Sequence, residues 1–179
     1  MRHILLAVAV LALIAGGACD CGSEKTPAQQ ASDELNRGLE AHSAGRLDEA
    51  AAAYYKVLAY DPQNKYAFYN LGLIDDTLGH PGPAESYYRL ALNIDPDYVP
   101  ALFNLAILRK NGGSTEEAIE LYRKVLTIEP DHADAHWNLG LALQEIGEES
   151  EAQEHLARAI EIDPNLEGRT PAPSPTPAP

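Results

Sequence analysis

The chain repeats itself at a spacing of 34 residues, and this regularity restricts it to folds built from stacked units. The stretch from residue 133 to 166 can be laid over the preceding residues three more times, which aligns four asparagines, four glycines and four prolines. These are Asn36, Asn70, Asn104 and Asn138; Gly45, Gly79, Gly113 and Gly147; and Pro62, Pro96, Pro130 and Pro164. Repeats of this length are typical of solenoids, in which each unit packs against its neighbours.

Each unit is predicted to be a pair of helices. Apolar residues recur at helical spacing on both sides of the central glycine, and the second helical pattern ends at Asp-Pro or Glu-Pro. Small residues recur where the two helices of a pair would meet, and a larger residue there would overpack the contact. These small residues are Gly38, Gly72 and Gly140 on the first helices and Ala50, Ala84, Ala118 and Ala152 on the second.

Three local signals refine the predicted helix ends. Ser114 and Glu117 have the spacing of a capping box at the start of a helix. The sequence Pro81-Gly82-Pro83 predicts a delayed start for the second helix of the second unit. No further helical pattern follows Leu166, so the end of the stack is expected to rely on a polar outer face, with partner docking or dimerisation at that end as the alternative.

Residues 66–72 (YAFYNLG) and 132–140 (HADAHWNLG) resemble the first half of the tetratricopeptide repeat (TPR) motif, and Ala84, Tyr88, Ala91 and Pro96 resemble its second half. The resemblance implies an all-α fold, in which four helix-turn-helix repeats form a right-handed solenoid arc over residues 31–166. The implied units are 31–64, 65–98, 99–132 and 133–166.

The residues before and after the repeats are predicted to have other roles. Residues 1–18 have the basic, apolar and small-residue order of a secretory signal peptide. The small residues directly before Cys19 resemble the lipobox of bacterial lipoproteins, which implies lipidation of Cys19, whereas ordinary signal cleavage is the alternative. Residues 19–30 are predicted to be a tether. Residues 167–179 are predicted to be a disordered proline-rich tail that acts as a spacer or as a ligand for a proline-binding partner.

Composition excludes several functions. The formal net charge of -14 argues against nucleic acid as a partner. Both cysteines, Cys19 and Cys21, precede the repeats, so no disulfide framework is expected within them. No catalytic motif is recognisable, so we expect neither enzymatic activity nor a cofactor. His132 and His136 are four residues apart, but the sequence supplies no third ligand, so no metal site is predicted.

The TPR resemblance also implies a binding surface, the concave face of the first helices. This face would carry two rows of apolar side chains with asparagines between them. The first row is Leu35, Tyr69, Phe103 and Trp137; the second is Leu39, Leu73, Ile107 and Leu141; the asparagines are Asn70, Asn104 and Asn138. An asparagine amide offers both a donor and an acceptor, so such a ladder can pair with the main chain of an extended peptide. The alternative is that the asparagines brace neighbouring helices.

Capture of a C-terminal carboxylate, another TPR binding mode, is not expected. It uses lysines and an arginine at positions that are here Leu35, Leu39, Tyr69, Pro100 and Asn104. The sequence therefore predicts a non-catalytic scaffold or adaptor in the bacterial cell envelope, held at the membrane by a lipid anchor and facing the periplasm. Its partners would be other proteins or peptide segments, bound as extended chains in the concave groove. The alternative function is a structural assembly factor for an outer-membrane secretin or a pilus-type machine.

Overall fold

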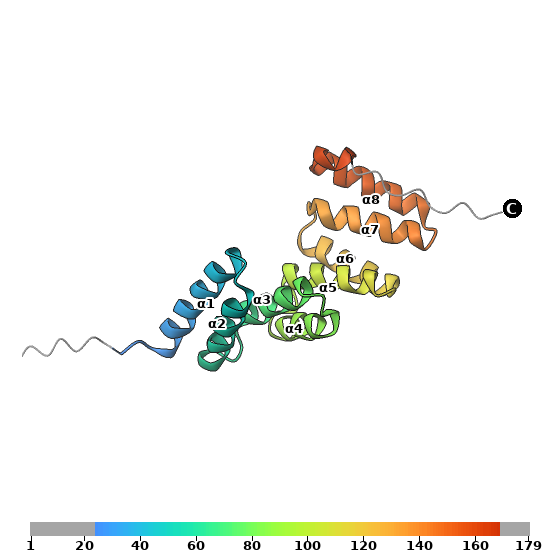
Figure 1. Ribbon diagram of the computed structural model, residues 1–179. Helices are drawn as coiled ribbons and strands as arrows, with labels where there is room; N and C mark the ends of the chain where they lie inside the picture. The colour runs from blue at the N-terminus through green and yellow to red at the C-terminus, as the bar shows by residue number, and fades with distance from the viewer. Residues whose placement is uncertain (1–23, 169–179) are drawn as a thin grey trace, which may run out of the picture.

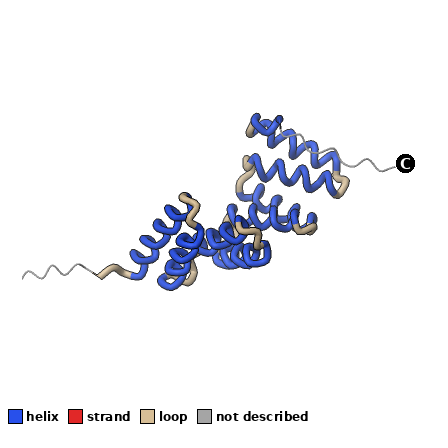
Figure 2. Tube along the Cα trace, in the orientation of Figure 1, coloured by secondary structure: helices blue, strands red, loops and turns tan. Residues whose placement is uncertain are grey.

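The structure is a computed structural model that describes residues 24–168, and within that range it is built from helices (Figure 2). The eight α-helices are α1 (Pro27–Ser43), α2 (Leu47–Tyr60), α3 (Lys65–Thr77), α4 (Pro81–Ile94), α5 (Val99–Asn111), α6 (Thr115–Ile128), α7 (Ala133–Glu145) and α8 (Glu149–Ile162). A 3-10 helix, η1 (Pro164–Gly168), follows them. The predicted signal peptide, Cys19 and residues 169–179 lie outside the described residues.

The helices form four hairpins that stack in chain order, α1 with α2, α3 with α4, α5 with α6 and α7 with α8. Figure 1 shows the stack as an open arc with α1 at one end and α8 at the other. The predicted all-α fold of four helix-turn-helix repeats is confirmed. None of the described helices has both the length and the apolar content needed to cross a bilayer.

The turn inside each hairpin depends on its glycine. Gly45, Gly79, Gly113 and Gly147 have positive φ angles of 72, 75, 80 and 85°, which glycine adopts without steric cost. The residue after each glycine donates its backbone N–H to a carbonyl five residues back, at 2.8 to 2.9 Å. This is the hydrogen bond that closes a helix in the Schellman motif. The repeated glycines thus end each first helix in the same way.

The two helices of a hairpin approach closely at the small residues, as predicted. A Cβ atom added to Gly38 would lie 2.4 Å from the Tyr54 ring, and one added to Gly72 would lie 2.6 Å from the Tyr88 ring. One added to Gly140 would lie 2.7 Å from Leu156. Larger residues at these glycines would therefore force the helices apart.

Helix starts differ from the predictions at two places, and a predicted capping hydrogen bond is missing at a third. Helix α1 begins at Pro27, so residues 27–30 of the predicted tether are helical, because Thr26 and Gln29 form a capping box. Helix α4 begins at Pro81 without delay. Proline is tolerated there because a backbone N–H in the first turn of a helix has no acceptor within the helix, so the N–H that proline lacks is not missed. Ser114 is the N-cap of α6 as predicted, but its side chain makes no capping hydrogen bond.

The C-terminal end of the stack also differs from the prediction. Glu167 and Gly168, predicted to begin the disordered tail, belong to η1. This short helix places Leu166, only 2% exposed, in a cluster with Trp137, Leu156 and Ala159. The last hairpin is therefore covered by an apolar side chain in addition to the polar face of α8.

Candidate functional site

The predicted concave face consists of side chains on the first helices of the hairpins. Tyr69 and Leu73 on α3, Phe103 and Ile107 on α5, and Leu141 on α7 are all half-buried. Each packs against a core cluster and keeps part of its surface accessible. Apolar surface thus recurs at the repeat spacing on these helices, and a long partner would meet it several times.

The prediction that every ring of the first row faces a partner does not hold for Trp137. It is only 7% exposed and packs in the core with Leu156, Ala159 and Leu166. Its neighbour η1 was not recognisable from helical periodicity, because a single turn gives no repeat of apolar positions. Trp137 therefore stabilises the last hairpin and is not available as a binding anchor.

The asparagines are engaged within the fold to different degrees. The Asn70 side chain is 8% exposed and donates to the backbone oxygen of Tyr66 at 2.8 Å. Asn104 donates to the hydroxyl of Tyr69 at 3.1 Å, which links α5 to α3. The bracing alternative therefore holds for Asn104. Asn138 is half-buried, and its side chain has no hydrogen-bond partner among residues 24–168.

Three members of the first apolar row each pack near the last residue of their own unit. The rings of Tyr69 and Tyr98 lie edge to face, with centroids 5.4 Å apart, and Phe103 stacks on His132 at 4.9 Å. Trp137 and Leu166 share a buried cluster. Leu35 and Asn64, the corresponding pair in the first unit, instead line an open pocket. The junctions are thus open at the N-terminal end of the stack and filled at its C-terminal end.

A second pocket, which we call the tyrosine pocket, lies between α1 and α3. It has a volume of about 420 Å³ and is lined by Leu35, Leu39, Tyr66, Tyr69, Asn70 and Tyr98. The ring of Tyr98 lies edge to face against those of Tyr66 and Tyr69, at 5.8 and 5.4 Å with interplanar angles of 90°. Sequence reasoning missed Tyr66 and Tyr98, although the aromatic residue at the N-cap position of α5 was a usable signal.

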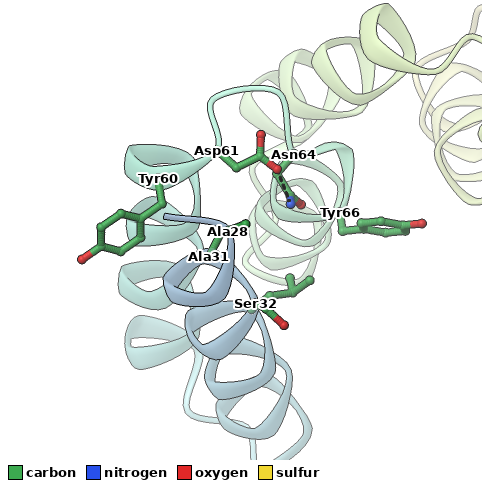
Figure 3. Close-up of a pocket in the computed structure, with 8 residues that line it drawn as sticks. Ala28, Ala31, Ser32, Tyr60, Asp61, Asn64 and Tyr66 are labelled. Carbon is green, nitrogen blue, oxygen red and sulfur yellow. Dashed lines mark hydrogen bonds between the residues drawn. The ribbon is translucent and has the colours of Figure 1, made fainter. Parts of the chain in front are cut away.

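The open pocket lined by Leu35 and Asn64 adjoins the tyrosine pocket and shares Leu35 and Tyr66 with it. Figure 3 shows Asp61 and Asn64 on one side of this pocket, with the rings of Tyr60 and Tyr66 projecting in opposite directions. Asn64 donates to Asp61 at 2.9 Å and accepts from the backbone N–H of Ala67 at 3.0 Å as the N-cap of α3. The two pockets therefore lie side by side along α1 and α3.

The charges near the tyrosine pocket are paired. Lys65 donates to Asp95 at 2.5 Å, and its ammonium lies 5.2 Å from the ring centroid of Tyr66 and 4.9 Å from that of Tyr98. The hydrogen bond to Asp95 raises the pKa of Lys65, and that to Lys65 lowers the pKa of Asp95. Burial raises the pKa of Tyr69 and brings the pKa of Tyr98 to about 12. Both hydroxyls are therefore protonated at neutral pH.

The histidines that resembled a metal pair do not converge. Nδ1 of His132 accepts from the backbone N–H of Ala135 and caps α7. The imidazole of His136 lies 2.8 Å from that of His155 and 2.9 Å from the carbonyl oxygen of Pro130. Between residues 24 and 168, no group of three or more His, Cys, Asp or Glu side chains is placed to hold a metal ion.

The fold and this surface define a class: an α-helical solenoid of stacked hairpins with an accessible apolar face on its first helices. Tetratricopeptide repeat models match residues 66–98, 87–120 and 133–166, and a TPR repeat model matches residues 38–74 and 109–147. The chain belongs to the tetratricopeptide repeat family. No curated protein sequence matches it significantly.

Solved structures share the fold. The crystal structure of MamA has 23% identity, a TM-score of 0.69, and coverage of 76% of this chain and 80% of its own. Pseudomonas aeruginosa pilF has 23% identity and a TM-score of 0.69, with 78% of this chain and 64% of its own covered. At these identities the similarity concerns the fold alone. The first TPR of Spaghetti (RPAP3), bound to the HSP90 peptide SRMEEVD, has 28% identity, a TM-score of 0.62, and coverage of 66% and 94%.

Proposed function

We propose that the protein is a non-catalytic scaffold that binds an extended segment of another protein along its concave face. The observation that carries this proposal is the apolar surface that recurs on α3, α5 and α7 and continues into the tyrosine pocket. The peptide-bound RPAP3 structure supports the same mode, since a TPR unit of similar fold there holds a short segment.

The chemistry of the face indicates what kind of segment it accepts. The HSP90 peptide SRMEEVD is acidic, whereas this chain has a net charge of -14 and would repel such a partner. Leu35, Leu39 and Pro100 supply no cation for a carboxylate. The partner segment is therefore apolar, with neutral or basic flanking residues.

An in-cell crosslinking pull-down with the full-length chain tests this function. Ile107→Ala removes half-buried apolar surface, and Asn138→Ala removes an amide that has no partner within the described fold. The double variant should recover the partner at least about tenfold less well, because a few central contacts dominate binding energy. Glu120→Ala, at an exposed position on α6, is the matched control.

Helicity and melting of the double variant must match the wild type. A folded double variant that recovers the same proteins at wild-type levels would exclude the concave face as the binding site. Recovery of secretin or pilus subunits, with loss of their complex on deletion, would instead favour the role of an assembly factor.

We also propose that the protein is exported and anchored at the cell envelope through Cys19. The support is the signal-peptide pattern of residues 1–18 and the small residues before the cysteine. A fatty-acid analogue should label the wild type and not Cys19→Ser. One acyl chain binds membranes only marginally and two bind firmly, so the variant should also move to the soluble fraction. Equal labelling of both would refute the anchor.

A further inference from the structure

The tyrosine pocket is a part of the concave face with both a hollow and an exposed rim. Its rim residues Leu39 and Tyr66 are 45% and 47% exposed, although both are large and apolar. Its volume of about 420 Å³ is within the ~300–1,000 Å³ typical of ligand pockets, room for one or two side chains of a bound segment. Contiguous exposed apolar surface of this kind marks an interaction site.

The lining of the pocket fits proline. Three tyrosines present ring faces and edges, and aromatic-lined grooves bind polyproline II segments because these are already extended and lose little entropy on binding. Such segments have no internal hydrogen bonds, so their carbonyl oxygens are free to accept. The hydroxyls of Tyr69 and Tyr98 remain protonated donors at neutral pH.

The chain itself contains a segment of this chemistry. Residues 169–179 have proline at every second position from Pro171 to Pro179, and their only charged side chain is that of Arg169. A basic residue before the prolines suits a protein of net charge -14, in which Asp61 lines the adjoining pocket. We propose that the tyrosine pocket binds the proline-rich segment 169–179 of a second copy of this chain. The proposal rests on the proposed function, because it takes the concave face as a surface that binds extended segments.

The position of the pocket makes this an association between copies. The described chain ends at Gly168, beside α8, at the opposite end of the stack from α1 and α3 (Figure 1). The eleven residues of 169–179 span about 34 Å at ~3.1 Å per residue. A contact between the C-terminal end of one copy and the α1–α3 end of the next is head-to-tail, and such contacts can continue from copy to copy.

Sedimentation velocity of the chain from residue 19 onward, under reducing conditions and over a wide concentration range, tests the proposal. The wild type should shift from monomer to larger species as concentration rises. Tyr66→Ala should weaken this association at least about tenfold, as should alanine at all five prolines of 169–179. Tyr55→Ala, an equally exposed tyrosine on α2 outside the pocket, should leave it unchanged. Because Tyr66 is exposed, the variant is expected to fold, which its melting curve verifies.

A labelled peptide of residues 169–179 gives the second readout. It should bind the chain truncated after Gly168, and Tyr66→Ala should reduce this binding by the same factor. Absence of both self-association and peptide binding would overturn the proposal, as would association that Tyr66→Ala leaves intact. A wild type that stays monomeric and binds the peptide only after truncation would show that the segment occupies its own pocket, which also overturns it. These measurements do not depend on the crosslinking pull-down with the Ile107→Ala and Asn138→Ala double variant. The pull-down tests the proposed function, so failure of one proposal can be told from failure of the other.

Discussion

The N-terminal and C-terminal halves of the solenoid use the same repeat positions for different purposes. Tyr69 and Trp137 are equivalent residues, and so are Tyr98 and Leu166, which are the last residues of the same two units. Tyr98 lies edge-on to Tyr69 and leaves the tyrosine pocket beside it, whereas Leu166 covers Trp137 completely enough to leave it 7% exposed. An aromatic residue of this row is thus partly accessible or buried depending on the side chain that the next segment packs against it.

The largest expected effect is at the filled junction. Trp137→Ala should lower the free energy of unfolding by about 3–5 kcal/mol, because it leaves a cavity under Leu166. Leu39→Ala at the rim of the tyrosine pocket should change it by less than about 0.5 kcal/mol. Denaturant unfolding curves of the two variants measure the difference. Similar midpoints for both would mean that the two halves do not differ in the way described.

The packing inside the hairpins should not differ between the halves, which confines the contrast to the junctions. Gly72→Ala and Gly140→Ala each place a Cβ within 2.7 Å of the facing helix, and should each cost about 1–3 kcal/mol. Ser86→Ala, at an exposed position on α4, is the control and should be neutral or slightly stabilising. A clear cost at Gly140 with none at Gly72 would extend the contrast into the hairpins themselves.

The two halves should also respond to different pH ranges. Burial and the neighbouring His136 lower the pKa of His155 below 6.5, so the folded state binds fewer protons at this site than the unfolded state. Its contribution to stability is complete above about pH 6.5 and is lost as the pH falls through the lowered pKa. In the other half, Lys65 lowers the pKa of Asp95. The contribution of the Asp95 carboxylate to stability therefore persists down to about pH 3.8 and is lost below it.

Melting temperatures of wild type and His155→Gln between pH 8 and pH 5 test this difference. The wild type should lose more stability than the variant on acidification, and Asp95→Asn should match the wild type over the same range. Glu151 lies 3.7 Å from His155 and favours its protonated form, so the loss is smaller than burial alone would cause. An identical pH dependence in wild type and His155→Gln would show that this histidine does not couple folding to pH.

The smallest effect is expected for a hydroxyl that both halves bury. Tyr54 on α2 and Tyr122 on α6 are fully buried, and neither hydroxyl has a hydrogen-bond partner among the described residues. Burial raises the pKa of Tyr54 to about 12. Phenylalanine removes the unpaired group, so Tyr54→Phe and Tyr122→Phe should be neutral or stabilising by up to about 1 kcal/mol. A marked loss in either variant would reveal a partner for that hydroxyl.

Much of the fold could be predicted because the repeat encodes it locally. The glycines at positive φ, the small residues between paired helices and the prolines that end each unit act within a few residues of themselves. Such local constraints recur at every 34 residues and identify the hairpins and their order from the sequence alone. The polar or apolar character of the rows on the first helices was recognisable in the same way.

The state of each row residue was decided by tertiary structure. Whether an aromatic ring is accessible depends on the side chain that the next segment places over it, and these contacts join residues far apart in the chain. The single turn of η1 buries Trp137, and Tyr66 and Tyr98 enclose a pocket that periodicity does not reveal. The sequence by itself therefore determined the solenoid, while packing between successive units decided which part of its surface remained open to a partner.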